Sequence, residues 1–138
     1  MNIAIAIAAL LISAFVGFGF FKAGSFKAKS SEAVLLSAGF GWVEKAGMPL
    51  VRVIAWLELL GAVGVILAPL AAIFLPGFEW ALTWGIAAAA GLALTMVVAF
   101  IMHAVRGEAK YTWKSNLQLF AAAAAAGLLQ AVISLPVF

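Results

Sequence analysis

The sequence predicts an all-α membrane protein, an antiparallel bundle of four transmembrane helices with a short interfacial helix between the first two. Hydrophobic residues make up 67% of the chain and charged residues only 9%, and the mean hydropathy is +1.23. Soluble domains are about half apolar and a quarter charged. Each membrane crossing needs roughly 20 apolar residues. Four spans therefore nearly fill the 138 residues, and we expect a single membrane domain.

Composition also excludes several kinds of site. The chain has no cysteine, which rules out disulfides, iron–sulfur clusters and thiolate metal sites. His103 is the only histidine, so a haem held by two histidines of one chain is excluded, and we expect no metal site. No cofactor ligand set is evident and no separate catalytic domain fits, which argues against an enzyme. The net charge of +3 does not indicate a nucleic-acid partner, because the basic residues border apolar spans.

The first apolar run, residues 2–21, is expected to be a retained helix rather than a signal peptide. It has no positively charged start and no small-residue cleavage site. The polar segment 22–48 follows as a long loop. Within it, Ser31 is expected to cap the short interfacial helix over residues 32–38, with its apolar side chains on the membrane surface. These side chains are Val34, Leu35 and Leu36.

Three more apolar runs follow. Pro49 suits the first turn of a helix over residues 49–68, which we expect to end before Pro69. The third helix is expected over residues 79–105. After a polar loop, residues 106–114, the fourth helix is expected over residues 115–134, and its alanine-rich centre would allow close approach of neighbouring helices.

Basic residues predict the orientation of the bundle. All eight lysines and arginines lie in the first loop, at the adjoining start of the second helix, or between the third and fourth helices. The opposite side has only Glu79. The positive-inside rule then makes loops 22–48 and 106–114 cytoplasmic and places both termini on the outer, periplasmic side. The expected location is a bacterial inner membrane.

Glu58 is the most informative residue, because it lies near the middle of the second apolar run. A charge at that depth costs on the order of 3 kcal/mol on insertion scales, so it normally faces protein or a water-filled cavity and finds a partner. Arg52, six residues earlier, projects roughly 120° away around the same helix, which makes a direct pair awkward. A purely structural alternative is a Glu58 that is hydrogen-bonded in its protonated form or paired to a neighbouring helix.

Small and polar residues form one stripe on each helix at spacings of three and four, and we expect these four stripes to face one another. The stripes contain Ser13, Gly17, Phe20 and Gly24; Val51, Ile54, Ala55, Glu58, Gly61, Ala62 and Val65; Gly85, Ala89, Leu92, Met96, Ala99, His103 and Arg106; and Asn116, Phe120, Ala123, Gly127, Gln130 and Ser134. The topology puts Lys22, Arg52, His103, Arg106 and Asn116 at the cytoplasmic end. The resulting hypothesis is a polar pocket that opens to the cytoplasm with Glu58 at its floor. The alternative is that His103 and Arg106 are interface residues without a ligand.

Four motifs together resemble the DoxX-like family of small four-helix membrane proteins, over residues 23–116. They are Ala23-Gly24 with Lys27, Gly41-Trp42-Val43-Glu44, Val51-Arg52 followed by Leu57-Glu58-Leu59-Leu60-Gly61-Ala62, and His103 with Arg106-Gly107-Glu108. The resemblance implies a shared polar site that would include Lys27, Glu44, Arg52, Glu58, His103, Arg106 and Glu108. It also implies diverse roles, including subunits linked to quinone-dependent sulfur oxidation, components of oxidative-stress complexes and assembly factors.

Three functions remain open at this point. The first is an accessory or assembly subunit of a larger membrane complex, redox or energy-converting, with membrane lipids and other membrane subunits as partners. The second is a quinone- or lipid-binding redox subunit, in which Glu58, His103 and Arg52 contact the head group and Trp56 helps to hold the tail. The third is a small proton-coupled transporter, which the strong charge bias disfavours.

Overall fold

The computed structural model describes residues 2–135, and this part of the chain forms six helices. The four long ones are α1 (Ile3–Lys29), α4 (Met48–Phe74), α5 (Ala81–Val105) and α6 (Ala109–Ser134). The two short ones are α2 (Glu32–Ser37) and α3 (Val43–Ala46). All four long helices have the length and apolar character needed to cross a membrane. The predicted all-α class with four candidate spans is therefore confirmed.

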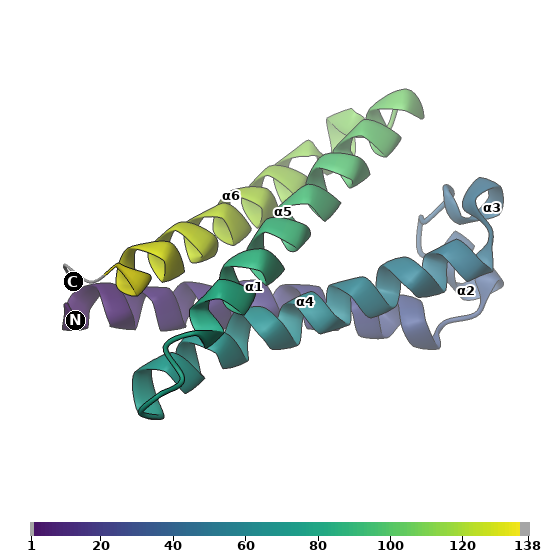
Figure 1. The fold of residues 1–138 in the computed structure, drawn as a ribbon. Coiled ribbons are helices and arrows are strands. Elements are labelled where there is room, and N and C mark those ends of the chain that lie inside the picture. Colours follow the sequence, from purple (N-terminus) through teal and green to yellow (C-terminus); the bar gives the residue numbers. More distant parts are fainter. Residues whose placement is uncertain (1, 136–138) are drawn as a thin grey trace.

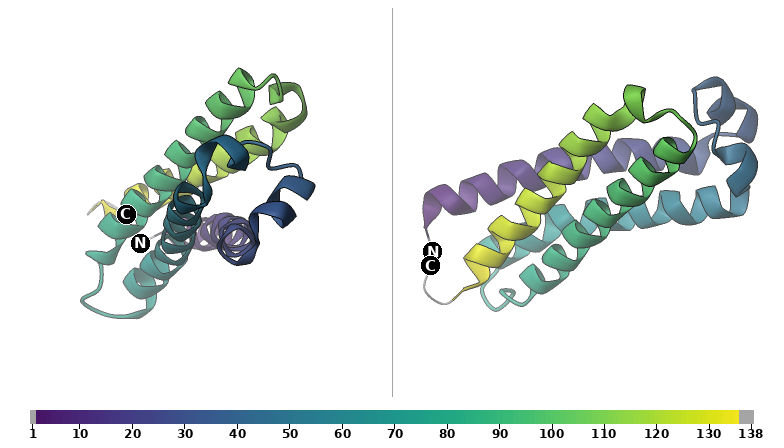
Figure 2. Two further views of the ribbon diagram at one scale, coloured as in Figure 1. Left: turned by 90° about the vertical axis from the view of Figure 1, so that its right-hand side faces the viewer. Right: turned by 90° about the horizontal axis from the view of Figure 1, so that it is seen from above.

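The long helices pack as two pairs. α1 lies along α4, and α5 lies along α6. The two pairs cross, and they diverge toward the end of the molecule that holds α2 and α3 (Figure 1). Figure 2 shows the same crossing from two further sides. At the diverging end α1 and α5 finish and α4 and α6 start, so most residues of the predicted polar pocket lie toward this end.

Two helices extend further than the apolar runs suggest. α1 continues past residue 21 to Lys29, because its last turns consist mainly of lysine, alanine and phenylalanine, with no proline to interrupt them. α6 begins at Ala109 rather than at residue 115, so the polar residues 109–114 form its first turns. Hydropathy marks the part of a helix that lies in lipid, whereas the helix itself continues into the polar interface.

The prediction that the second long helix ends before Pro69 is wrong. Pro69 lies inside α4, which continues to Phe74. Proline removes one backbone donor, but membrane helices tolerate this loss where neighbouring helices or local adjustment satisfy the freed groups. Pro69 is fully buried, and the apolar residues that follow it extend the span.

α2 and α3 form a small cap on the start of α4. The Ser31 side chain accepts a hydrogen bond from the backbone N–H of Val34 at 3.4 Å, as expected of an N-cap. The expectation that Leu35 lies on the membrane surface is wrong, because Leu35 is fully buried in a second hydrophobic cluster. That cluster also contains Trp42, Val43 and Val51. It fixes the path of the chain between α1 and α4.

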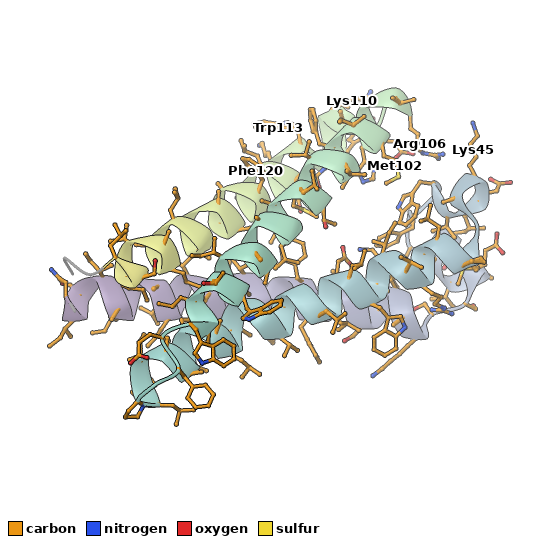
Figure 3. All side chains as sticks on the ribbon, viewed as in Figure 1. Lys45, Met102, Arg106, Lys110, Trp113 and Phe120 are labelled. Carbon is orange, nitrogen blue, oxygen red and sulfur yellow. The ribbon has the colours of Figure 1, made fainter. Side chains whose placement is uncertain are left out.

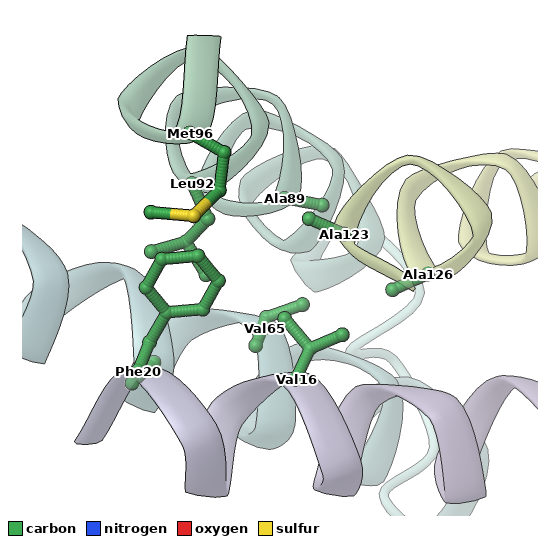
Figure 4. Packing of buried hydrophobic residues seen from close by; sticks show 9 residues of the cluster. Val16, Phe20, Val65, Ala89, Leu92, Met96, Ala123 and Ala126 are labelled. Carbon is green, nitrogen blue, oxygen red and sulfur yellow. The ribbon is translucent and has the colours of Figure 1, made fainter. Parts of the chain in front are cut away.

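The main core brings together residues from all four predicted stripes (Figure 4). Phe120 and Ser134, which were expected on the inward stripe of α6, are exposed instead. Its buried residues are Val16 and Phe20 from α1, Ala62 and Val65 from α4, Ala89, Leu92 and Met96 from α5, and Ala123 and Ala126 from α6. Alanine predominates where helices meet, because a small side chain lets two backbones approach closely.

A buried glutamine links three of the helices. Gln130 of α6 donates hydrogen bonds from Nε2 to the Ser13 hydroxyl of α1 at 3.0 Å and to the Val65 carbonyl of α4 at 3.1 Å. Gly85 of α5 provides the space, because a Cβ at that position would lie 1.9 Å from Gln130 Oε1. In a membrane such bonds contribute about 0.6 kcal/mol on average, so their main effect is to fix the register of the helices.

Replacing Gly24 by alanine should destabilise the bundle. A Cβ at this position would stand 2.9 Å from the backbone carbonyl oxygen of Ala55 and 3.2 Å from Glu58 Cβ, so α1 would have to move away from α4. Overpacking of this kind costs about 1–3 kcal/mol. Gly91→Ala is the matched control, because nothing lies within 4 Å of a Cβ there. Thermal unfolding in detergent measures both, and equal melting temperatures for the two variants would contradict the close approach of α1 and α4.

Candidate functional site

The centre of the site is an ion pair between α1 and α4. Lys27 Nζ lies 2.7 Å from both Oε1 and Oε2 of Glu58. The Lys27 side chain is 10% exposed and the Glu58 side chain 2%. Glu58 is thus compensated by a cation from another helix, as a charge inside an apolar bundle requires. Both carboxylate oxygens are occupied by the same ammonium group.

Arg52 supports this pair from one side. Its guanidinium donates from Nη1 to the backbone carbonyl of Lys27 and from Nη2 to that of Ser30 at 2.8 Å. These carbonyls lie at the C-terminal end of α1, where backbone acceptors have no partner within the helix. Arg52 therefore fixes the turn that holds Lys27, and it reaches Glu58 only indirectly, in keeping with the angular separation predicted from the sequence.

A second polar group lies between α5 and α6. Glu108 accepts a hydrogen bond from Arg106 Nε to Oε1, and its Oε2 lies 2.9 Å from His103 Nδ1. A carboxylate at Nδ1 makes that nitrogen the protonated one, which leaves Nε2 as the acceptor of a neutral ring. The pKa of Glu108 is lowered below its ordinary value of 4.5. The hydrogen bond with His103 makes the largest contribution, and the hydrogen bond with Arg106 adds to it.

Both polar groups border one large cleft. Its volume is about 950 Å³, and residues from all four long helices line it. Most of the wall is apolar, with contributions from Phe20, Ile54, Leu60, Leu92, Trp84 and Met96. Its polar lining consists of Lys27, Glu58, Thr95, His103, Tyr111, Thr112, Ser115 and Asn116. A long apolar wall with a few polar groups is the usual composition of a small-molecule site.

The polar lining of the cleft includes a buried hydrogen-bond donor without an acceptor in the described residues, the side-chain amide of Asn116. Its Nδ2 is buried, and it has no hydrogen-bond partner among residues 2–135. A buried amide donor without an acceptor costs about 1–3 kcal/mol. An acceptor oxygen on a bound molecule would remove that cost.

The structure brings some of the predicted site residues together and leaves others apart. Lys27, Glu58, His103 and Asn116 line the cleft, with Arg52 behind Lys27 and with Glu108 and Arg106 behind His103. Lys22, Glu44 and Trp56 are exposed and form no part of the cleft wall. Trp56, at 59% exposure, faces away from the position where it was expected to hold a ligand tail.

Sequence reasoning did not identify Lys27 as the partner of Glu58. Lys27 continues the helix stripe of Ser13, Gly17, Phe20 and Gly24 by a further three residues, and this spacing is the signal that could have shown it. Because the helix was expected to end at residue 21, the spacing was not extended as far as Lys27. Gln130 was placed on the inward stripe of its helix, but its bonds to two other helices were not predicted.

Residues 6–127 match the DoxX-like family. No curated protein and no solved structure matches the chain. Among residues 2–135, no three histidine, aspartate or glutamate side chains gather closely enough to hold a metal ion.

The ion pair should behave as one energetic unit. Removing one partner of a buried pair leaves an uncompensated charge and costs about 3–5 kcal/mol, whereas replacing both by apolar residues is often close to neutral. We expect Lys27→Met and Glu58→Met each to destabilise the protein by that amount, and the double variant to recover most of the loss. Denaturant unfolding in detergent measures the four corners of the cycle.

Lys22→Met is the control for this cycle, since Lys22 is an exposed lysine of the same helix. We expect it to leave stability nearly unchanged. Additive losses at Lys27 and Glu58 would show that the two side chains do not interact.

Glu108 should make stability sensitive to acid. Because its pKa is lower in the folded protein than its ordinary value of 4.5, its contribution is present above about pH 4.5 and is lost as the pH falls through the folded value. Melting temperatures between pH 7 and pH 3 should therefore drop further for the wild type than for Glu108→Gln. Parallel curves for the two proteins would refute this role of Glu108.

Proposed function

The chain belongs to the DoxX-like family, and we propose that it is an accessory subunit of a larger redox or energy-converting membrane complex, in which the cleft beside Lys27 and Glu58 binds an amphiphilic molecule of the quinone or lipid class. The observation that carries this proposal is the cleft of about 950 Å³, with apolar walls and a few polar groups. Four apolar helices make the chain an integral membrane protein in contact with lipid.

The chemistry of the lining favours a neutral head group. Lys27 and Glu58 compensate each other at 2.7 Å, so neither presents a free charge to a ligand. The Asn116 amide offers a donor without a partner, which suits a carbonyl oxygen. A quinone ring has two such oxygens and a long apolar tail, and the apolar walls would bury that tail.

His103 is the residue best suited to exchange a proton with a bound quinone. Glu108 orients its ring through Nδ1 at 2.9 Å, and His103 lines the cleft. Because Nδ1 is held by Glu108, Nε2 is the ring nitrogen that is able to accept or donate a proton. A bound quinone would supply the two-electron chemistry, and the electron donor would belong to a partner subunit.

An assembly role without a small-molecule ligand is the second candidate. The cleft is bordered by the small residues Gly64, Ala87, Ala88 and Gly91, and small residues are typical of surfaces against which another membrane helix packs. In this case a helix of a partner subunit would occupy the cleft.

The ion pair argues against proton-coupled transport. A transporting carboxylate has to release and take up protons during each cycle, whereas both oxygens of Glu58 are held by one ammonium group. For orientation we retain the proposal from the charge bias, with α2 and α3 on the cytoplasmic side of a bacterial inner membrane and both termini on the outer side.

A quinone titration tests the ligand proposal. Trp42 and Trp84 line the cleft, so decyl-ubiquinone added to the purified protein in detergent should quench tryptophan fluorescence with saturation. Asn116→Leu removes one hydrogen-bond donor, and we expect about fivefold weaker binding. Gln118→Leu, an exposed amide on the same helix, is the matched control and should bind like the wild type. Quenching that does not saturate, or equal losses in the two variants, would exclude this site.

A further inference from the structure

A second, smaller pocket lies at the diverging end of the bundle. Its volume is about 520 Å³, and Trp42, Lys45, Met102, Val105 and Arg106 line it. Lys45 belongs to α3, whereas Arg106 directly follows α5. Figure 3 shows the Arg106 side chain extending from the end of α5 toward α3, from which Lys45 projects outward. Trp42 and Met102 also line the large cleft, so they form the boundary between the two pockets.

The Arg106 guanidinium is aimed at α3. Its Nε donates to Glu108 Oε1 at 2.9 Å, which fixes the orientation of the group. Its Nη2 lies 2.6 Å from the position that a Cβ of Gly41 would occupy. Glycine at position 41 therefore leaves room for the end of this arginine beside the start of α3.

The two cations have unused donors. Within residues 2–135, neither the Lys45 ammonium nor the terminal nitrogens of Arg106 have a hydrogen-bond or ion-pair partner, since only Arg106 Nε is engaged. The carboxylate of Glu108 is shared between His103 and Arg106. The pocket therefore has donors left over for an anion.

The remaining walls are apolar. Trp42 is 5% exposed and gives the pocket a rigid wall, whereas Val105 is 83% exposed beside it. Val105 is the last residue of an apolar helix long enough to cross a membrane, so the pocket lies at the level where a span meets the polar interface. A ligand that fits this pocket therefore combines an anionic group with an apolar part on the membrane side of that group.

We propose that this pocket binds the phosphate of an anionic phospholipid, with Lys45 and Arg106 on the phosphate oxygens and an acyl chain against Met102 and Val105. Arginine and lysine are the usual ligands of phosphate groups, and basic pockets between membrane helices bind anionic lipid head groups. The proposal is independent of the large cleft, because its ligand is charged and its cations are different residues.

The test measures lipid binding to the full chain by native mass spectrometry, with phosphatidylglycerol compared with phosphatidylcholine of the same acyl chains. The wild type should prefer phosphatidylglycerol. Lys45→Gln should weaken that binding about fivefold. Gly41→Ala should weaken it too, because the new Cβ displaces the flexible end of Arg106. Lys110→Gln, which removes the same charge outside the pocket, should retain the wild-type preference.

Each other outcome would overturn the proposal. An equal loss of phosphatidylglycerol binding in Lys110→Gln would show that the lipid is attracted to the basic residues of this end of the bundle in general, and not to a defined pocket. Competition by inorganic phosphate, with the same dependence on Lys45, would mean a site for the free anion. Melting temperatures of all variants are recorded in parallel, and binding by Gly41→Ala and Lys45→Gln at wild-type strength in folded protein would exclude both cationic contacts.

Discussion

A carboxylate buried in an apolar helix needs a cation beside it, and the arrangement of α1 and α4 follows from this requirement. Lys27 meets Glu58 at 2.7 Å only because α1 stays helical to Lys29 and because Gly24 lets the two backbones approach. Arg52 then binds the end of α1 through two carbonyl groups. The pair, the close approach and the arginine thus form one interdependent unit that sets one wall of the cleft.

The sequence was sufficient for the class of the fold and for the inward faces of the helices, because both depend on strong periodic patterns. Ser13, Ala62, Leu92 and Ala123 all lie on predicted stripes, and all are buried. It was insufficient where a local rule was overridden by the membrane. A proline usually ends or kinks a helix in a soluble protein, yet α4 continues through Pro69. The apolar run ends at residue 21, so Lys27 lay outside the helix expected from hydropathy. In the structure Lys27 lies on the same buried face of α1 as Gly24.

The charged residues at the diverging end of the bundle line two different pockets. In the large cleft the charges of Lys27 and Glu58 compensate each other, and His103 is hydrogen-bonded to Glu108 through Nδ1, so the lining suits a neutral amphiphile. In the small pocket Lys45 and Arg106 retain free donors, so its lining suits an anion. Trp42 and Met102 separate the two, which lets neighbouring sites at one membrane interface accept ligands of different charge.

The most direct test of the proposed role is native mass spectrometry of the protein extracted gently from its own membrane, with identification of every polypeptide and every lipid-like molecule that stays bound. We predict larger subunits in fixed stoichiometry, together with a quinone or another neutral amphiphile retained by this chain. A solitary chain that is released without any such molecule would contradict both the accessory role and the ligand assigned to the cleft.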